Sequence, residues 1–254
     1  TETVLIGEII GRSESKMLWM AKSYEDFRTD SVIKIPIIDH KFCYSFKADA
    51  IESYQLAFEE EAKSGAYRPV TFFSEKDTIT LTLNNNEKFD NNVVLGGIVN
   101  EEYTNFSKLI RKKFYSRYDS ISEKYKAYDY KAFQSEDYIA LMSQLRLAKT
   151  QEEKVLLYQK QKKLQDAGLD KSELGKVRDV EFKAVHTDIV NYRYNYIAKH
   201  PSLVSYDLLL TDMIGFDYMD VPLNKVLEAY NALKPKYKNH PYGKISENLI
   251  FGIT

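Results

Sequence analysis

The pattern of apolar and polar positions changes once along the chain, close to Gly96. Before that point apolar residues recur at every second position, as Ile33 and Ile35 do, which is typical of a strand with one buried face. After it they recur at every third or fourth position, which is typical of an amphipathic helix. The sequence therefore predicts an α+β protein, with an antiparallel β-sandwich-like or barrel-like domain over residues 1–97 and an α-helical domain over residues 98–254.

The first part contains about seven or eight short apolar runs separated by polar turns, the pattern of a sandwich or a partly open barrel. Pro36 has no backbone N–H to donate, so its strand is expected to end there or to lie at a sheet edge. Phe42, Tyr44 and Phe46 share one face of the next strand. The acidic run 59–61 is interpreted as the solvated end of a later strand.

The helical part is organised around residues 179–214. A long helix is expected to stop at His200, because Pro201 disfavours helix in the residue before it. Ser202 is expected to cap the next helix, and residues 150–153 carry a capping-box pattern that predicts the start of another. The apolar face of the long helix is predicted to contain Leu174, Val177, Val185, Ile189, Tyr192 and Tyr196.

Composition narrows the class of protein. The 254 residues are 29% charged and 44% hydrophobic, with a formal net charge of −1, as in ordinary globular domains. No basic stripe is dense enough to predict a nucleic-acid interface. No apolar run approaches the roughly 20 residues of a membrane-spanning helix. The chain begins with Thr1 rather than Met, so we expect a mature chain from which a targeting segment was removed.

Side chains that carry chemistry are sparse. Cys43 is the single cysteine, so this sequence has neither an intrachain disulfide nor a CxxC pair, and Cys43 is interpreted either as a small buried or edge residue or as a reactive thiol. The four histidines lack metal-ligand spacing, and no GxSxG, P-loop or GxGxxG motif occurs. The Asn-rich loops at 84–86 and 90–92 do not have EF-hand spacing. No catalytic residue, metal ligand or cofactor site is predicted.

Tyrosine is unusually frequent, with 20 residues. Tyrosine suits interfaces, because its ring packs while its hydroxyl stays hydrated. A possible contact surface for a protein partner or an extended ligand is therefore predicted where tyrosines are densest. The alternative is that these rings serve as core and boundary residues. The residues concerned are Tyr115, Tyr118, Tyr125, Tyr128 and Tyr130.

Several segments together resemble a known family. They are residues 7–11, 41–42, 70–75 and 78–83, the pair Gly96-Gly97, and residues 196–202 with 204–205 and 208–209. In this order they resemble the uncharacterised DUF4369-like domain that precedes thioredoxin-like domains in bacterial thiol-disulfide oxidoreductases of the TlpA and AhpC/TSA type. Two positions depart from the family pattern. Asp39-His40-Lys41 stands where an Asp-Gly turn is common, and Gly97 stands where Ser or Thr is common.

The resemblance implies an exported protein of a Gram-negative bacterium, in the periplasm or associated with the outer membrane, with a possible lipid anchor upstream of Thr1. It transfers no catalytic residue, because the family's redox cysteines have no counterpart in this sequence. The first hypothesis is a non-enzymatic accessory or binding module that contacts an unidentified protein or ligand. The second is the N-terminal part of a thioredoxin-like oxidoreductase without its CxxC domain. The third is a glycan-binding protein that uses aromatic platforms.

Overall fold

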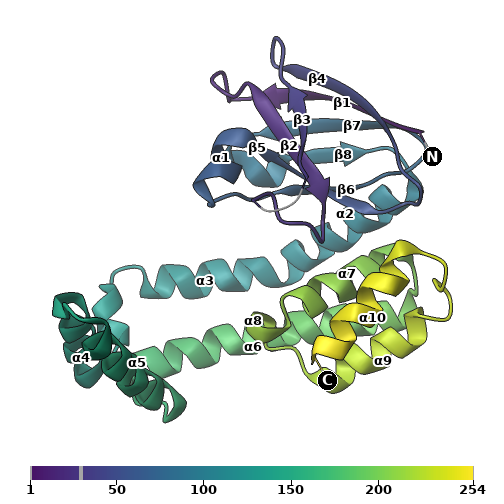
Figure 1. Cartoon of the computed structure of the whole chain (residues 1–254). Coiled ribbons are helices and arrows are strands. Elements are labelled where there is room, and N and C mark those ends of the chain that lie inside the picture. The colour runs from purple at the N-terminus through teal and green to yellow at the C-terminus, as the bar shows by residue number, and fades with distance from the viewer. Residues whose placement is uncertain (1, 29–30, 254) are drawn as a thin grey trace. The chain divides into compact units, whose positions relative to one another are not determined.

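The computed structural model describes residues 2–28 and 31–253, with strands up to residue 95 and long helices after it (Figure 1). This order confirms the predicted α+β class; the expectation attached to Thr1 concerns a residue outside these ranges. The strands are β1 (Glu2–Ile10), β2 (Met17–Lys22), β3 (Ile33–Pro36), β4 (Lys41–Lys47), β5 (Ser53–Phe58), β6 (Val70–Phe73), β7 (Asp77–Asn84) and β8 (Val93–Leu95).

The strands form two four-stranded sheets, in the orders β4-β1-β7-β8 and β3-β2-β5-β6. Every pair is antiparallel except β1 with β7, which run parallel. Alternate side chains of both sheets point inward and form one core, as expected for a sandwich. Its fully buried members include Leu5 and Leu81 from the first sheet and Leu18, Leu56 and Phe72 from the second.

The turn before β4 contains Asp39-His40 where an Asp-Gly pair is common, and it still adopts a hairpin conformation. Asp39 and His40 both have positive φ, 47° and 61°. Ile38 and Lys41 flank them and exchange backbone hydrogen bonds of 2.8 and 2.9 Å. Two left-handed residues between a bonded pair define the type I′ turn that matches the strand twist. Pro36 ends the edge strand β3, as predicted.

Most predicted helix boundaries are confirmed. The long helix α6 ends at Lys199, directly before His200-Pro201, and a complete capping box starts α5 at Thr150. The long helices are α2 (Ile98–Ile110), α3 (Ser116–Tyr125), α4 (Glu136–Leu147), α5 (Gln151–Asp166), α6 (Glu173–Lys199), α7 (Leu203–Ile214), α9 (Leu223–Leu233) and α10 (Pro241–Ile253). Shorter helical segments are α1 (Glu59–Ser64), η1 (Asn86–Asn91), a π-helical turn between α2 and α3 (Arg111–Tyr115), η3 (Tyr130–Phe133) and α8 (Phe216–Met219).

Two local expectations are wrong. The acidic run 59–61 forms the first turn of α1 rather than a solvated strand end, and carboxylates are favourable there because they face the positive end of the helix dipole. Val177 is 52% exposed instead of belonging to a buried face, whereas Val185 and Ile189 are buried. Periodicity shows which residues share a helix face, but it does not show how far along the helix a neighbour covers that face.

The chain divides into two compact units by its contacts. Unit 1 comprises residues 1–108 and 192–254, and so contains the sandwich together with α7, α8, α9 and α10. Unit 2 comprises residues 109–191, which include α3, α4, α5 and the first part of α6. The change from strands to helices and the division into compact units thus fall at different places. The two domains at 1–97 and 98–254 remain a prediction from the sequence.

Candidate functional site

The five tyrosines of the predicted contact surface all lie in unit 2, and four of them form two pairs. Tyr115 and Tyr118 have ring centroids 6.1 Å apart, and Tyr118 also stacks on Phe182 at 5.8 Å. Tyr125 and Tyr128 are 6.3 Å apart and both contact Phe133. Tyr125 is buried, Tyr118 is half-buried, and Tyr115, Tyr128 and Tyr130 are exposed. Tyr125 therefore belongs to the core of unit 2, whereas Tyr115, Tyr128 and Tyr130 lie on its surface.

Helix α5 is the most exposed long helix of unit 2. None of its 16 residues is buried. Its inner face meets α4 through half-buried residues such as Leu157 and Gln161, and the side-chain amide of Gln161 donates to the Tyr138 hydroxyl at 2.9 Å. The outer face of α5, which we define as Val155, Leu156 and Tyr158, is 45%, 60% and 56% exposed.

The first half of α6 has the same character. Val177 and Val180 lie one helical turn apart, and both side chains are exposed. Leu147 at the end of α4 and Leu169 between α5 and α6 are exposed as well. Single exposed apolar residues are normal on protein surfaces, but unit 2 carries several of them on α4, α5 and α6.

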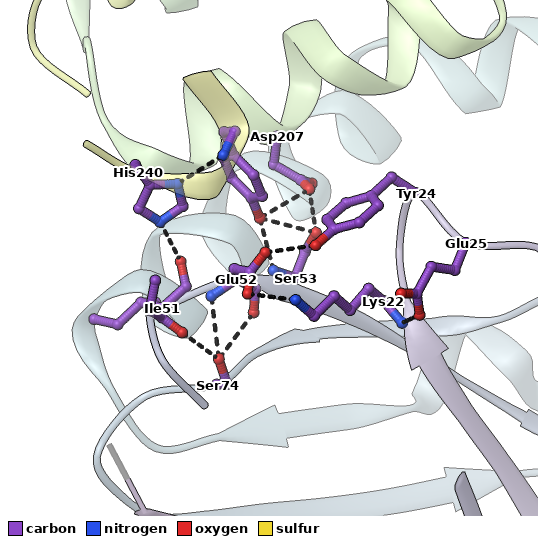
Figure 2. A network of polar contacts seen from close by, with 11 residues as sticks. Lys22, Tyr24, Glu25, Ile51, Glu52, Ser53, Ser74, Asp207 and His240 are labelled. Atoms are coloured by element: carbon purple, nitrogen blue, oxygen red, sulfur yellow. Dashed lines mark hydrogen bonds and ion pairs between the residues drawn. The ribbon is translucent and has the colours of Figure 1, made fainter. Parts of the chain in front are cut away.

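A second feature is a buried polar network in unit 1, which joins strand β5 to two helices (Figure 2). Ser53 on β5 donates its hydroxyl to the Asp207 carboxylate on α7. The Tyr242 hydroxyl on α10 accepts a hydrogen bond from the Ser53 backbone N–H at 2.7 Å and lies 3.1 Å from the Ser53 hydroxyl. Burial raises the pKa of the Asp207 carboxyl to about 6.

The network continues through Glu52, whose side chain is also buried. One carboxylate oxygen accepts from Lys22 at 2.8 Å and the other from the Tyr24 hydroxyl at 2.6 Å. The Glu52 backbone N–H donates to the Ser74 hydroxyl at 3.1 Å. Burial, followed by the hydrogen bond to Glu52, raises the pKa of Tyr24 well above its usual range. Each charge in this part of the network therefore has a partner.

His240 closes the network at the start of α10 (Figure 2). Its Nε2 lies 2.9 Å from the carbonyl oxygen of Ile51, and its Nδ1 accepts from the backbone N–H of Tyr242 at 3.2 Å. An imidazole that accepts at one nitrogen and donates at the other is neutral. Burial lowers the pKa of His240, in agreement with that state.

These side chains do not form a nucleophilic triad. Ser53 and Tyr242 are fully buried, and His240 is bonded to the Ile51 carbonyl instead of to Ser53 or Asp207. The network is therefore a joint that fastens β5 to α7 and α10. The one feature of the sequence that points to this joint is Asp207 within the apolar segment 203–214, because a buried carboxylate requires a hydrogen-bond partner. Asp212, in the same segment, is also buried and forms an ion pair with Arg193.

Cys43 lies on the edge strand β4 and its side chain is exposed. Its outward position agrees with the predicted alternation, in which Phe42 and Tyr44 face the core. Across the residues that the structure describes, no helix combines the length and the apolarity that crossing a membrane requires.

Comparison with known proteins identifies the N-terminal region only. Residues 3–103 match the family described as "Domain of unknown function (DUF4369)". No curated protein matches the sequence. Among solved structures, a DUF3823 family protein from Parabacteroides merdae is similar at 16% identity, over 33% of this chain and 45% of that chain, with a TM-score of 0.24. The matched region is thus less than half of that protein, and a score this low carries no conclusion about fold.

Proposed function

We propose, from the premise that residues 3–103 match the DUF4369 family, that the chain is a non-enzymatic binding module whose unit 2 holds another protein. The observation that carries the proposal is α5, a 16-residue helix with no buried residue and an apolar outer face. A helix in a globular domain normally buries one apolar stripe and exposes polar residues opposite. Here the inner stripe is only half-buried and the opposite face is apolar too.

The energetics favour an occupied outer face. Burying one large apolar side chain fully stabilises a complex by about 1.5–3 kcal/mol. Val155, Leu156 and Tyr158 together therefore supply enough apolar surface for the centre of an interface. Unit 2 contains 17 Lys and Arg residues against 13 Asp and Glu, so it is positively charged while unit 1 is negatively charged. The partner surface that fits is apolar at its centre and acidic at its rim.

Site-specific crosslinking tests this proposal. A photoreactive amino acid is placed at Leu156 and, in a control, at Lys160, which is exposed on the same helix. We expect one protein to be captured from cells of the source bacterium at position 156 in large excess over position 160. That protein is then purified and its affinity for the whole chain is measured.

Reconstitution decides the outcome. Leu156→Ser is expected to weaken the complex by about tenfold or more, since a central apolar contact is lost, and Lys160→Ser to leave it nearly unchanged. Equal capture at both positions, or equal affinity of the Leu156→Ser variant and the parent chain, contradicts a contact through α5.

We also propose that the protein is exported to the periplasm or the outer membrane. The support for this location is the resemblance of the sequence to exported bacterial proteins. Fractionation of the source bacterium, with an antibody against this chain, is expected to find it outside the cytoplasm. Recovery together with cytoplasmic markers would overturn the proposal.

A further inference from the structure

The outer face of the sheet β4-β1-β7-β8 carries a groove of about 560 Å³. Most of its lining residues belong to three neighbouring strands, β4, β1 and β7, which Figure 1 shows side by side. Strand register places its lining in two rows, each containing one residue from each strand. The first row is Cys43, Ile6 and Thr80, and the second is Lys41, Glu8 and Thr82. Small-molecule sites have volumes of about 300–1,000 Å³, so the groove has the size of a ligand site.

Part of the groove lining is apolar. Ile6 on β1 is 38% exposed, and Ile38, in the turn before β4, is 68% exposed. Pro36 completes this surface. An exposed β-sheet face that carries isoleucine is the exception in a sandwich, whose outer faces are normally polar.

Two charges of opposite sign lie beside these apolar residues. Glu8 and Lys41 are direct cross-strand neighbours. Glu8 already accepts a hydrogen bond from the Thr82 hydroxyl, at 3.4 Å. The Lys41 ammonium makes neither an ion pair nor a side-chain hydrogen bond with any residue that the structure describes. An ammonium has three donors and no acceptor. The charged group of the groove that is still available to a ligand is therefore a cation.

We propose that this groove binds a small amphipathic molecule, with an apolar body against Ile6, Pro36 and Ile38 and a carboxylate on Lys41. The apolar wall supplies burial, and the ammonium supplies a charge-assisted hydrogen bond. Glu8 opposes the carboxylate electrostatically, so removing its charge strengthens binding. The site is separate from the α5 contact of unit 2, and the two proposals stand or fall independently.

Cys43 allows occupancy of the groove to be measured directly. It is the single cysteine of the sequence and an exposed member of the lining. A ligand in the groove therefore slows alkylation of the thiol in the native protein. The probes are decanoate, below its micellar concentration, and decylammonium, which has the same apolar chain and the opposite charge.

We expect decanoate to bind and to slow alkylation of Cys43 several-fold. Lys41→Gln is expected to weaken decanoate binding about tenfold, the effect of losing a hydrogen bond to a charged group. Glu8→Gln is expected to strengthen it. Lys47→Gln is the matched control, because Lys47 lies on the same face of β4 but outside the groove. All three residues are exposed, and circular dichroism checks that each variant is folded.

Four results would overturn the proposal. The first is decanoate binding without protection of Cys43. The second is an equal loss in Lys41→Gln and Lys47→Gln. The third is tighter binding of decylammonium than of decanoate, which would assign the groove to cations held by Glu8. Absence of binding by both probes up to their micellar concentrations also contradicts it.

Discussion

At the scale of single residues, Gly7 shows how one missing side chain shapes the sandwich. It lies opposite Phe42 in the register of β1 and β4. A Cβ atom on Gly7 would overlap the ring of Phe42 and would come within 2.6 Å of the Leu81 carbonyl oxygen. The ring of Phe42 thus occupies the space that a side chain on Gly7 would need. A glycine inside a strand often marks such a close approach.

Gly7→Ala is therefore expected to lower the free energy of unfolding by about 1–3 kcal/mol, the usual cost of overpacking a core. Urea unfolding measures the change. The control is Gly252→Ala, since no atom lies within 4 Å of a Cβ built at Gly252, and it should cause no loss. Equal stability of Gly7→Ala and the parent chain would contradict the steric argument.

At the scale of elements, α5 and α7 have similar caps but very different surroundings. Thr150 accepts from the Glu153 N–H at 3.2 Å, and the Glu153 carboxylate accepts from the Thr150 N–H at 3.2 Å. Ser202 accepts from the Ser205 N–H at 3.2 Å and donates to Glu102. Helix α7 has many buried residues and α5 has none. Local capping thus contributes a larger share of the stability of α5 than of α7.

Thr150→Ala and Ser202→Ala are both expected to cost about 1 kcal/mol, the usual value for an N-cap. Hydrogen exchange should separate them. Loss of the Thr150 cap should accelerate exchange only within α5, because that helix can fray without exposing a core. Loss of the Ser202 cap should lower the global stability of unit 1. Identical exchange patterns for the two variants would be inconsistent with a loosely packed α5.

At the scale of the whole molecule, the joint around Asp207 couples the sandwich to the helices of unit 1. Burial raises the pKa of Asp207 from 3.8 to about 6. Between these values the folded state keeps a proton that the unfolded state releases. The free energy of unfolding therefore falls as the pH rises from about 4 to about 6, by up to about 3 kcal/mol, and is level above that range.

Other titrating groups face the same joint. His240 acts in the opposite direction: burial lowers its pKa, so folding loses stability as the pH falls below its usual value of 6.5. Tyr242 from α10 and Tyr103 from α2 have raised pKa values, partly through the charge of Asp207, and stay neutral across this range. Because the parent chain and a variant at Asp207 both contain His240, the contribution of His240 to the pH dependence cancels in their comparison.

Asp207→Asn should remove the contribution of Asp207. Relative to this variant, the free energy of unfolding of the parent chain is expected to fall by up to about 3 kcal/mol between pH 4 and pH 7. Urea unfolding at several pH values measures it. Asp217→Asn, at an exposed position of α8, is the matched control and should leave the pH profile unchanged. Parallel profiles for Asp207→Asn and the parent chain would exclude the assignment.

The sequence alone was sufficient for the fold class and for most element boundaries. Alternation in β3 and β4, the stop at Pro201 and the capping box at Thr150 depend on interactions between residues that are close in the chain, so they can be read directly. The sequence did not predict α1, because an acidic run is also compatible with the solvated end of a strand. It also assigned Val177 to a buried face, because periodicity does not show where neighbouring elements end.

The joint and the groove depended on the tertiary structure. Ser53, Asp207 and Tyr242 are far apart in the sequence, and only the packing of β5 against α7 and α10 gives the buried carboxylate its hydroxyl partners. The rows Cys43-Ile6-Thr80 and Lys41-Glu8-Thr82 likewise exist only because β1 pairs with β4 on one side and with β7 on the other. Local periodicity reflects short-range sterics and burial, whereas a binding site requires long-range register, which no stretch of sequence specifies by itself.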